Sequence, residues 1–356
     1  IRDSGEYLRY LEDRGISTNV ASFVGASTVR VHEMGYEDRD PTPEELTGMQ
    51  DLVRQAMEEG AVGLGSSLPY IPAPFASTEE LIALAGAAAE YDGLYISHIR
   101  NEGDEIFEAL DEFVRIVREA PIRGEIYHLK MSHKRNWPRM DEVIARIEAA
   151  RAEGLAITAD IYTYHASSTG LNYDFPSWVK EGGHEEFVAR LQDPEARRRV
   201  IEEAEMIPPE DILLVSFRNE ELRHLTGKTL AEVAAMRGTS PVATAMDLIV
   251  EDDSRIGTVR FTMDEDNIRK KIALPWVSFC SDSASMAPEE PFTNDQPHPR
   301  AYGSFARLLG KYVRDEGIIS LEEAVRRLTW LPAQNLRVVD RGRLAPDYFA
   351  DIVIFD

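Results

Sequence analysis

Short apolar runs rich in β-branched residues alternate along this chain with longer stretches of helical periodicity. The apolar runs are Asn19–Val24, Ala61–Leu64, Leu94–Ser97, Glu125–Leu129, Leu155–Ile161, Ile212–Phe217 and Trp276–Cys280. Strand and helix alternating at this spacing favour a parallel sheet with crossover helices, either an open doubly wound sheet or a closed barrel. No GxGxxG motif follows an early run, so we prefer a TIM-like (β/α) barrel, which places its chemistry where strands end and loops begin.

Helix starts carry clear capping signals. Thr42-Pro43-Glu44-Glu45 and Ser77-Thr78-Glu79-Glu80 each place a hydroxyl residue before early acidic residues, which is typical of a helix N-terminus. Periodicity predicts further helices over Glu105–Glu119, Met140–Glu153, His184–Ala204, Thr229–Arg237, Tyr302–Glu316 and Leu321–Trp330.

Charge and composition limit the partners. Among 356 residues, 63 acidic residues outnumber 39 basic ones, for a formal net charge of -24. Such a chain repels nucleic acid and anionic membranes, so we expect a small-molecule substrate. No apolar run approaches the roughly 20 residues that span a bilayer. The single cysteine, Cys280, suits a reducing compartment, and we therefore expect a cytoplasmic protein.

Polar side chains follow several predicted strands at the same end. His98, His128, Asp160 and Asp282 each stand at or just after such a run. A barrel would gather these strand ends around one cavity, where histidine and carboxylate could bind zinc and an acid could move protons. Each residue has a structural alternative: either histidine could only make hydrogen bonds, and either aspartate could cap or brace a loop.

Two loop residues could bind a substrate. Arg300, in the Pro-braced stretch Pro297–Gly303, carries a planar guanidinium that suits a carboxylate, although a surface arginine fits the pattern equally well. Tyr70 lies between prolines and carries a hydroxyl that could donate to an anion, and its alternative is ordinary packing.

An ordered set of motifs resembles the D-aminoacylase (N-acyl-D-amino-acid deacylase) branch of the amidohydrolase superfamily. The set covers nearly the whole chain and comprises Gly60–Leu64 with Leu68–Tyr70, Phe75–Leu81, Ile96–Gly103, His128–Lys130, Ser281–Asp282, Pro297–Gly303, Gly342–Pro346 and Ala350–Val353. The resemblance implies a metal-dependent barrel that hydrolyses N-acyl-D-amino acids to a D-amino acid and a carboxylate, with one or two zinc or other divalent ions.

The resemblance also implies site residues. His128 matches a strand-end metal ligand, Asp282 matches the general base and acid and a second metal contact, and Arg300 matches an arginine expected to hold the substrate carboxylate. His98 is a further metal-ligand candidate in a segment typical of the family. Arg100, from the same segment, and Tyr70 are further candidates for substrate binding.

Two departures from the family pattern set expectations about the architecture. The chain has neither the His-x-His pair of the first barrel strand nor a cysteine ligand on the next, which we interpret as a missing N-terminal portion. Residues 1–338 are then expected to form a barrel that lacks its first strands. Residues 339–356 would be the returning strand of a small β-sandwich.

Two other functions are compatible with these patterns. One is a cyclic amidase of the dihydroorotase or hydantoinase type, which would keep the fold and change the substrate. The other is a non-catalytic barrel or inactive fragment, which the missing His-x-His pair would favour. The resemblance does not indicate the preferred side chain, the acyl group or the oligomeric state.

Overall fold

The computed structural model describes residues 3–290 and 292–356, and its centre is a sheet of parallel strands. The strands run in the order β1-β2-β3-β4-β5-β9, and every neighbouring pair is parallel. Their bounds are Val24–Gly25 (β1), Gly63–Ser67 (β2), Leu94–His98 (β3), Arg123–Ile126 (β4), Ile157–Ile161 (β5) and Val277–Phe279 (β9). The expected parallel α/β architecture is confirmed, whereas within the described ranges β1 and β9 remain the two edges of an open sheet.

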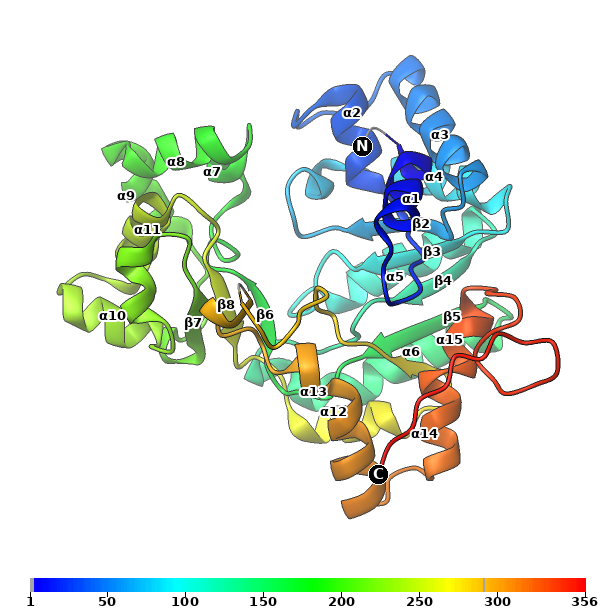
Figure 1. Ribbon diagram of the computed structural model, residues 1–356. Helices are drawn as coiled ribbons and strands as arrows, with labels where there is room; N and C mark the ends of the chain where they lie inside the picture. The colour runs from blue at the N-terminus through cyan, green and yellow to red at the C-terminus, as the bar shows by residue number, and fades with distance from the viewer. Residues whose placement is uncertain (1–2, 291) are drawn as a thin grey trace.

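Crossover helices connect these strands and cover the sheet (Figure 1). They are α2 (Ala26–Met34), α3 (Pro43–Glu58), α4 (Thr78–Ala89), α5 (Ile106–Glu119), α6 (Met140–Ala152) and α12 (Glu265–Ile272), with α1 (Ser4–Arg14) preceding them. The predicted capping signals work as expected: Thr42 Oγ1 accepts from the Glu45 N–H while the Glu45 carboxylate accepts from the Thr42 N–H. These paired bonds satisfy backbone donors that the first helical turn leaves free.

Residues 167–260 lie between β5 and β9 in the sequence and form a separate layer, which we call the insert. An antiparallel sheet of order β6-β8-β7 contains Ser167–Gly170 (β6), Ile212–Ser216 (β7) and Gly257–Arg260 (β8). Its helices are α7 (Ser177–Lys180), α8 (His184–Gln192), α9 (Pro194–Glu203), α10 (Leu230–Arg237) and α11 (Pro241–Asp252). The insert has its own apolar core and lies to the left in Figure 1, opposite the helices of the parallel sheet.

Three sequence predictions are corrected by this arrangement. The run Ile212–Phe217 is a strand, but it joins the antiparallel sheet, since periodicity identifies a strand and not its partner. The single helix expected over His184–Ala204 is two helices, because Asp193 caps the second and Pro194 has no N–H to continue the first. The helix expected over Tyr302–Glu316 begins earlier, at Arg300, and passes into a π-helix.

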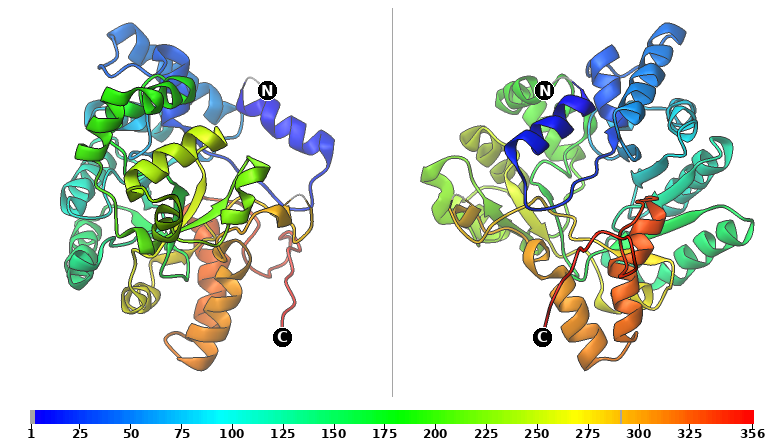
Figure 2. Two further views of the ribbon diagram at one scale, coloured as in Figure 1. Left: turned by 90° about the vertical axis from the view of Figure 1, so that its left-hand side faces the viewer. Right: turned by 45° about the vertical axis from the view of Figure 1, so that its right-hand side comes forward.

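The C-terminal part packs beside the parallel sheet (Figure 2). It contains α13 (Arg300–Arg307), the π-helix Leu308–Asp315, α14 (Leu321–Leu328) and α15 (Trp330–Asn335). The returning β-strand expected in 339–356 does not form, and 351–356 are irregular and exposed, because a strand requires a neighbouring backbone to pair with. Among the described helices, none is long and apolar enough to cross a membrane.

Candidate metal centre and active site

Four parallel strands bring polar side chains to one edge of the sheet. His98 is the last residue of β3, Asp160 lies in β5, His128 follows β4 and Asp282 follows β9. Both His128 (φ 34°) and Asp282 (φ 48°) have left-handed backbone conformations, which turn the chain sharply out of its strand direction. Because the carboxyl ends of parallel strands lie at the same end of the sheet, residues far apart in sequence face one cavity.

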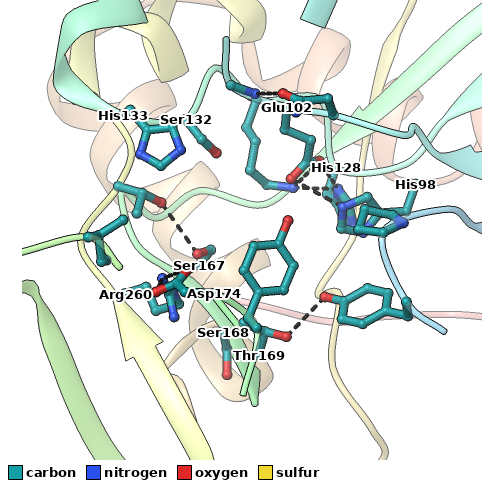
Figure 3. Close-up of a pocket in the computed structure, with 18 of the residues that line it drawn as sticks. His98, Glu102, His128, Ser132, His133, Ser167, Ser168, Thr169, Asp174 and Arg260 are labelled. Carbon is teal, nitrogen blue, oxygen red and sulfur yellow. Dashed lines mark hydrogen bonds and ion pairs between the residues drawn. The ribbon is translucent and has the colours of Figure 1, made fainter. Parts of the chain in front are cut away.

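His98, Glu102 and His128 form a compact cluster at this edge (Figure 3). Glu102 Oε2 lies 3.3 Å from His98 Nε2, and Glu102 Oε1 lies 3.1 Å from His128 Nδ1. One ligand atom from each residue falls within 4.8 Å of the others, and the two imidazole centroids are 4.5 Å apart. The Asn101 carboxamide oxygen accepts from the Gly103 N–H at 2.7 Å, in the turn that contains Glu102.

The electrostatics of the cluster suit a divalent cation. Burial lowers the pKa of His128 to about 4, with Lys130 adding to the effect, so its imidazole is neutral as a metal ligand must be. Burial alone would raise the pKa of Glu102, but His98, Lys130 and His128 hold it well below its ordinary value. The buried His98 Nε2 makes no hydrogen bond within the described part of the chain. Two imidazoles and a carboxylate form a donor set that fits zinc.

Lys130 is a fourth member of this cluster. Its ammonium lies 2.6 Å from Glu102 Oε1 and 2.5 Å from His128 Nδ1, and the side chain is 3% exposed. The Lys130 ammonium therefore lies among side chains that could bind a metal ion. The His128–Lys130 segment resembled the family, but that resemblance did not indicate a site role for Lys130.

A second group faces the cavity from the loop after β9. Arg300 Nη1 lies 2.5 Å from Asp282 Oδ2, and the Arg300 guanidinium carbon is 4.6 Å from the centre of the Tyr162 ring. The Tyr162 ring also lies 6.4 Å from that of His128. Tyr162 therefore connects the predicted proton-transfer and carboxylate-binding residues with the His–Glu–His cluster.

Asp160, in β5, and Cys280, directly after β9, lie next to the site residues. The Asp160 carboxylate accepts from the His128 N–H at 2.7 Å, which orients the backbone next to a candidate ligand. Burial raises the pKa of Asp160 to about 6 and that of the Cys280 thiol well above its ordinary value. A thiol that stays protonated is a poor nucleophile.

Tyr70 and Arg100, the two remaining candidates for substrate binding, differ in their hydrogen-bond partners. Tyr70 packs edge-on against His98, with centroids 5.5 Å apart, and its hydroxyl lies 3.0 Å from Thr169 Oγ1 in the insert. The Arg100 guanidinium donates to both Glu112 oxygens and to the carbonyls of Pro74 and Ala76. These bonds favour a bracing role for Arg100, and its contact with substrate stays a prediction.

The six site residues that the resemblance implies all line one large cavity of about 1890 Å³ between the sheet edge and the insert. Sequence reasoning left Glu102 without a role and did not single out Lys130, Tyr162, Asp174 or Arg260. Glu102 follows His98 by four residues, a spacing that would have suggested the pair. Nothing in the sequence indicated that Arg260 would face the same cavity, because the insert brings it there.

The chain belongs to the amidohydrolase family, whose pattern matches residues 5–356. The resemblance inferred from the motifs is thereby confirmed. More particularly, the chain is 33% identical over 355 residues to N-acyl-D-glutamate deacylase and 34% identical over 351 residues to D-aminoacylase, both of Alcaligenes xylosoxydans xylosoxydans. Each alignment covers 99% of this chain but only 64% and 63% of the respective relative.

A solved structure has a similar fold. It is N-acyl-D-glutamate deacylase from Bordetella bronchiseptica, complexed with zinc and a phosphonate inhibitor that mimics the tetrahedral intermediate of the reaction. The TM-score is 0.80 at 32% sequence identity, over 98% of this chain and 64% of that chain. The present chain thus spans slightly less than two thirds of the length of the proteins it matches.

Proposed function

We propose that this protein takes part in the metal-dependent hydrolysis of N-acyl-D-amino acids to a D-amino acid and a carboxylate. The observation that carries the proposal is the His98–Glu102–His128 cluster, which shares one cavity with the Asp282–Arg300 pair. Amide hydrolysis needs an activated water, a group that moves protons and a group that orients the substrate. The cavity offers a candidate for each.

His98 and His128, with Glu102 and Asp282 as further candidates, would hold the metal ion. A zinc ion bound there would polarise the amide carbonyl and lower the pKa of a bound water to about 7. Lys130, whose Nζ lies 2.6 Å from Glu102 Oε1, would limit the repulsion between this carboxylate and an approaching anionic substrate. Asp160 would keep His128 in place through the backbone bond described above.

Asp282 would take a proton from the attacking water and deliver it to the departing amine nitrogen as the carbon–nitrogen bond breaks. General acid–base transfer of this kind contributes about 10²–10⁴-fold to rates. Arg300, next to Asp282, would bind the substrate carboxylate through its planar fork. Tyr70, which packs against His98, and Arg100 would be further substrate-binding residues.

The architecture of the complete barrel belongs to the same proposal. The unbroken parallel order β1-β2-β3-β4-β5-β9 supports the proposal that residues 1–338 belong to a barrel. A cytoplasmic location also stays a prediction. The substrate is a small molecule, and the oligomeric state is not part of the proposal.

Turnover and metal content together test this proposal. The purified protein with zinc is expected to hydrolyse N-acetyl-D-amino acids at least a hundredfold faster than their L-enantiomers or cyclic ureides. Preference for cyclic ureides would replace the proposal with a cyclic amidase, and an absence of bound divalent metal by elemental analysis would favour the non-catalytic alternative. His128→Asn is expected to lose the metal, whereas His184→Asn is a matched control, because His184 lies in the insert beside Asp253.

A further inference from the structure

The wall of the cavity opposite the metal cluster contains a second buried polar group. Arg260, at the end of β8, donates from Nη2 to both oxygens of Asp174, at 2.7 and 2.5 Å. The two side chains are 3% and 6% exposed, and both residues line the cavity. Figure 3 shows them across the cavity from His98 and His128.

The other terminal nitrogen of this guanidinium is unused. Arg260 Nη1 is buried and has no hydrogen-bond partner within residues 3–290 and 292–356. A buried donor without a partner destabilises the folded protein, and more so when the group is charged. Because Arg260 lines the cavity, a rotation of its guanidinium that turns Nη1 toward the cavity would let an acceptor from a bound ligand satisfy this nitrogen.

A series of aromatic contacts connects the metal cluster with the Arg260–Asp174 pair. From His98 the contacts run through Tyr70, at a centroid distance of 5.5 Å, to Tyr173, at 5.8 Å. The guanidinium carbon of Arg260 then lies 5.5 Å from the centre of the Tyr173 ring. Tyr70 and Tyr173 both line the cavity, so a substrate bound at the metal cluster would extend along these rings toward the Arg260–Asp174 pair.

The charges around the pair favour a neutral ligand group. Asp174 compensates Arg260, and two other cations that line the cavity are also paired: Lys134 Nζ lies 3.4 Å from Asp211 Oδ2, and Arg135 contacts Asp104. Lys180 is a further cation there, and its ammonium donates to the Tyr173 carbonyl at 3.4 Å. A carboxylate buried here would meet the Asp174 carboxylate, and like charges repel.

Donor and acceptor are arranged side by side. Arg260 Nη1 carries two unpaired N–H donors, and the Asp174 oxygens retain acceptor capacity beyond their bonds to Nη2. A primary carboxamide complements both, since its oxygen accepts from Nη1 while its amide nitrogen donates to Asp174. We propose that Arg260 and Asp174 form a specificity subsite for the side-chain carboxamide of N-acyl-D-glutamine or N-acyl-D-asparagine. This inference rests on the proposed function.

The subsite is tested by kcat/KM for three N-acetyl-D-amino acids with side chains of similar length: glutamine, glutamate and norvaline. With the zinc-loaded protein we expect glutamine to exceed glutamate and norvaline by at least tenfold. Asp174→Asn removes the compensating negative charge, and we expect the preference to reverse in favour of glutamate. Arg260→Gln is expected to lower the glutamine-to-norvaline ratio about tenfold, whereas Lys134→Met, on the same wall, should leave that ratio as it is.

Several outcomes would overturn the inference. Equal or better turnover of the glutamate substrate by the unaltered protein would do so, as would an unchanged glutamine-to-glutamate ratio in Asp174→Asn. Turnover of all three substrates at similar rates would reject the subsite and keep the proposed function, whereas turnover of none would reject both. If Asp174→Asn does not fold, calorimetric titration of the unaltered protein with D-glutamine and D-glutamate decides: tighter binding of D-glutamate contradicts the subsite.

Discussion

Arg300 Nη1 lies 2.5 Å from Asp282 Oδ2, so the predicted carboxylate-binding residue and the predicted proton carrier form an ion pair before any substrate is bound. The Arg300 side chain is 9% exposed and that of Asp282 is 32% exposed. The partial exposure leaves the aspartate accessible from the cavity. A substrate carboxylate would share Arg300 with Asp282 or take the place of Asp282. Substrate binding would therefore change how firmly Arg300 holds the Asp282 carboxylate.

Asp282→Asn is expected to lower kcat by about 10²–10⁴-fold, because an amide cannot carry the transferred proton. Most of the zinc should stay bound, since His98, Glu102 and His128 are intact. Steady-state kinetics with elemental analysis checks both statements. Asp211→Asn is the control, because Asp211 lines the same cavity and has no proposed role in proton transfer. Near-normal kcat in Asp282→Asn would remove this residue from the mechanism.

Arg300→Lys is expected to raise KM for N-acyl-D-amino acids about tenfold or more, because an ammonium cannot reproduce a bidentate contact with a carboxylate. The ion pair with Asp282 should persist, so kcat should change less than KM. Initial-rate measurements separate the two constants. An unchanged KM would contradict the assignment of Arg300 to substrate binding.

Lys271 predicts a pH dependence of stability. Its ammonium, in α12, is 1% exposed and donates to the Leu129 carbonyl at 2.6 Å, and burial lowers its pKa from an ordinary value of 10.5 to about 7. Between these two pH values the unfolded chain binds more protons than the folded chain, so this residue makes the free energy of unfolding rise with pH. The contribution reaches about 1.4 kcal/mol per pH unit.

Lys271→Met should therefore flatten the rise in unfolding free energy between about pH 7.5 and 9.5, as measured by chemical denaturation. Lys270→Met is the matched control, because Lys270 is the adjacent residue and its ammonium pairs with Asp141 at 2.8 Å near the surface. Equal slopes in the two variants would show that the Lys271 ammonium is not desolvated.

Gly63 tests the pairing that positions His98. A Cβ at Gly63 would lie 1.9 Å from the Leu94 carbonyl oxygen, which is backbone and cannot move aside without breaking the register between β2 and β3. Gly63→Ala should lower the free energy of unfolding by at least about 1–3 kcal/mol. Gly86→Ala, in α4, meets nothing within 4 Å and should raise it by about 1 kcal/mol. Similar stabilities for the two variants would contradict the close approach of β2 and β3.

Much of the local structure was predictable because its causes are local. The bonds of the Thr42 capping box join residues three positions apart, and this prediction is confirmed. The break before Pro194 has an equally local cause, although the single helix expected over His184–Ala204 missed it. The runs at Leu94–Ser97 and Leu155–Ile161 are strands because their side chains suit a buried pleated sheet. The prediction for Ile212–Phe217 was wrong about the sheet that this strand joins, because the pattern of a strand does not identify the strand that pairs with it.

The candidate site likewise contains residues that the sequence predicted and residues that only the tertiary structure revealed. From its sequence alone, this protein was assigned to its family, expected to place His98, His128 and Asp282 at strand ends, and expected to carry Arg300 nearby. Only the tertiary structure joined Glu102 and Lys130 to the histidines, paired Arg300 with Asp282, and brought Arg260 and Asp174 from the insert to the opposite wall. The reason is physical: propensities and caps act over a few residues, whereas a cavity depends on which strands pair and how two packed layers meet.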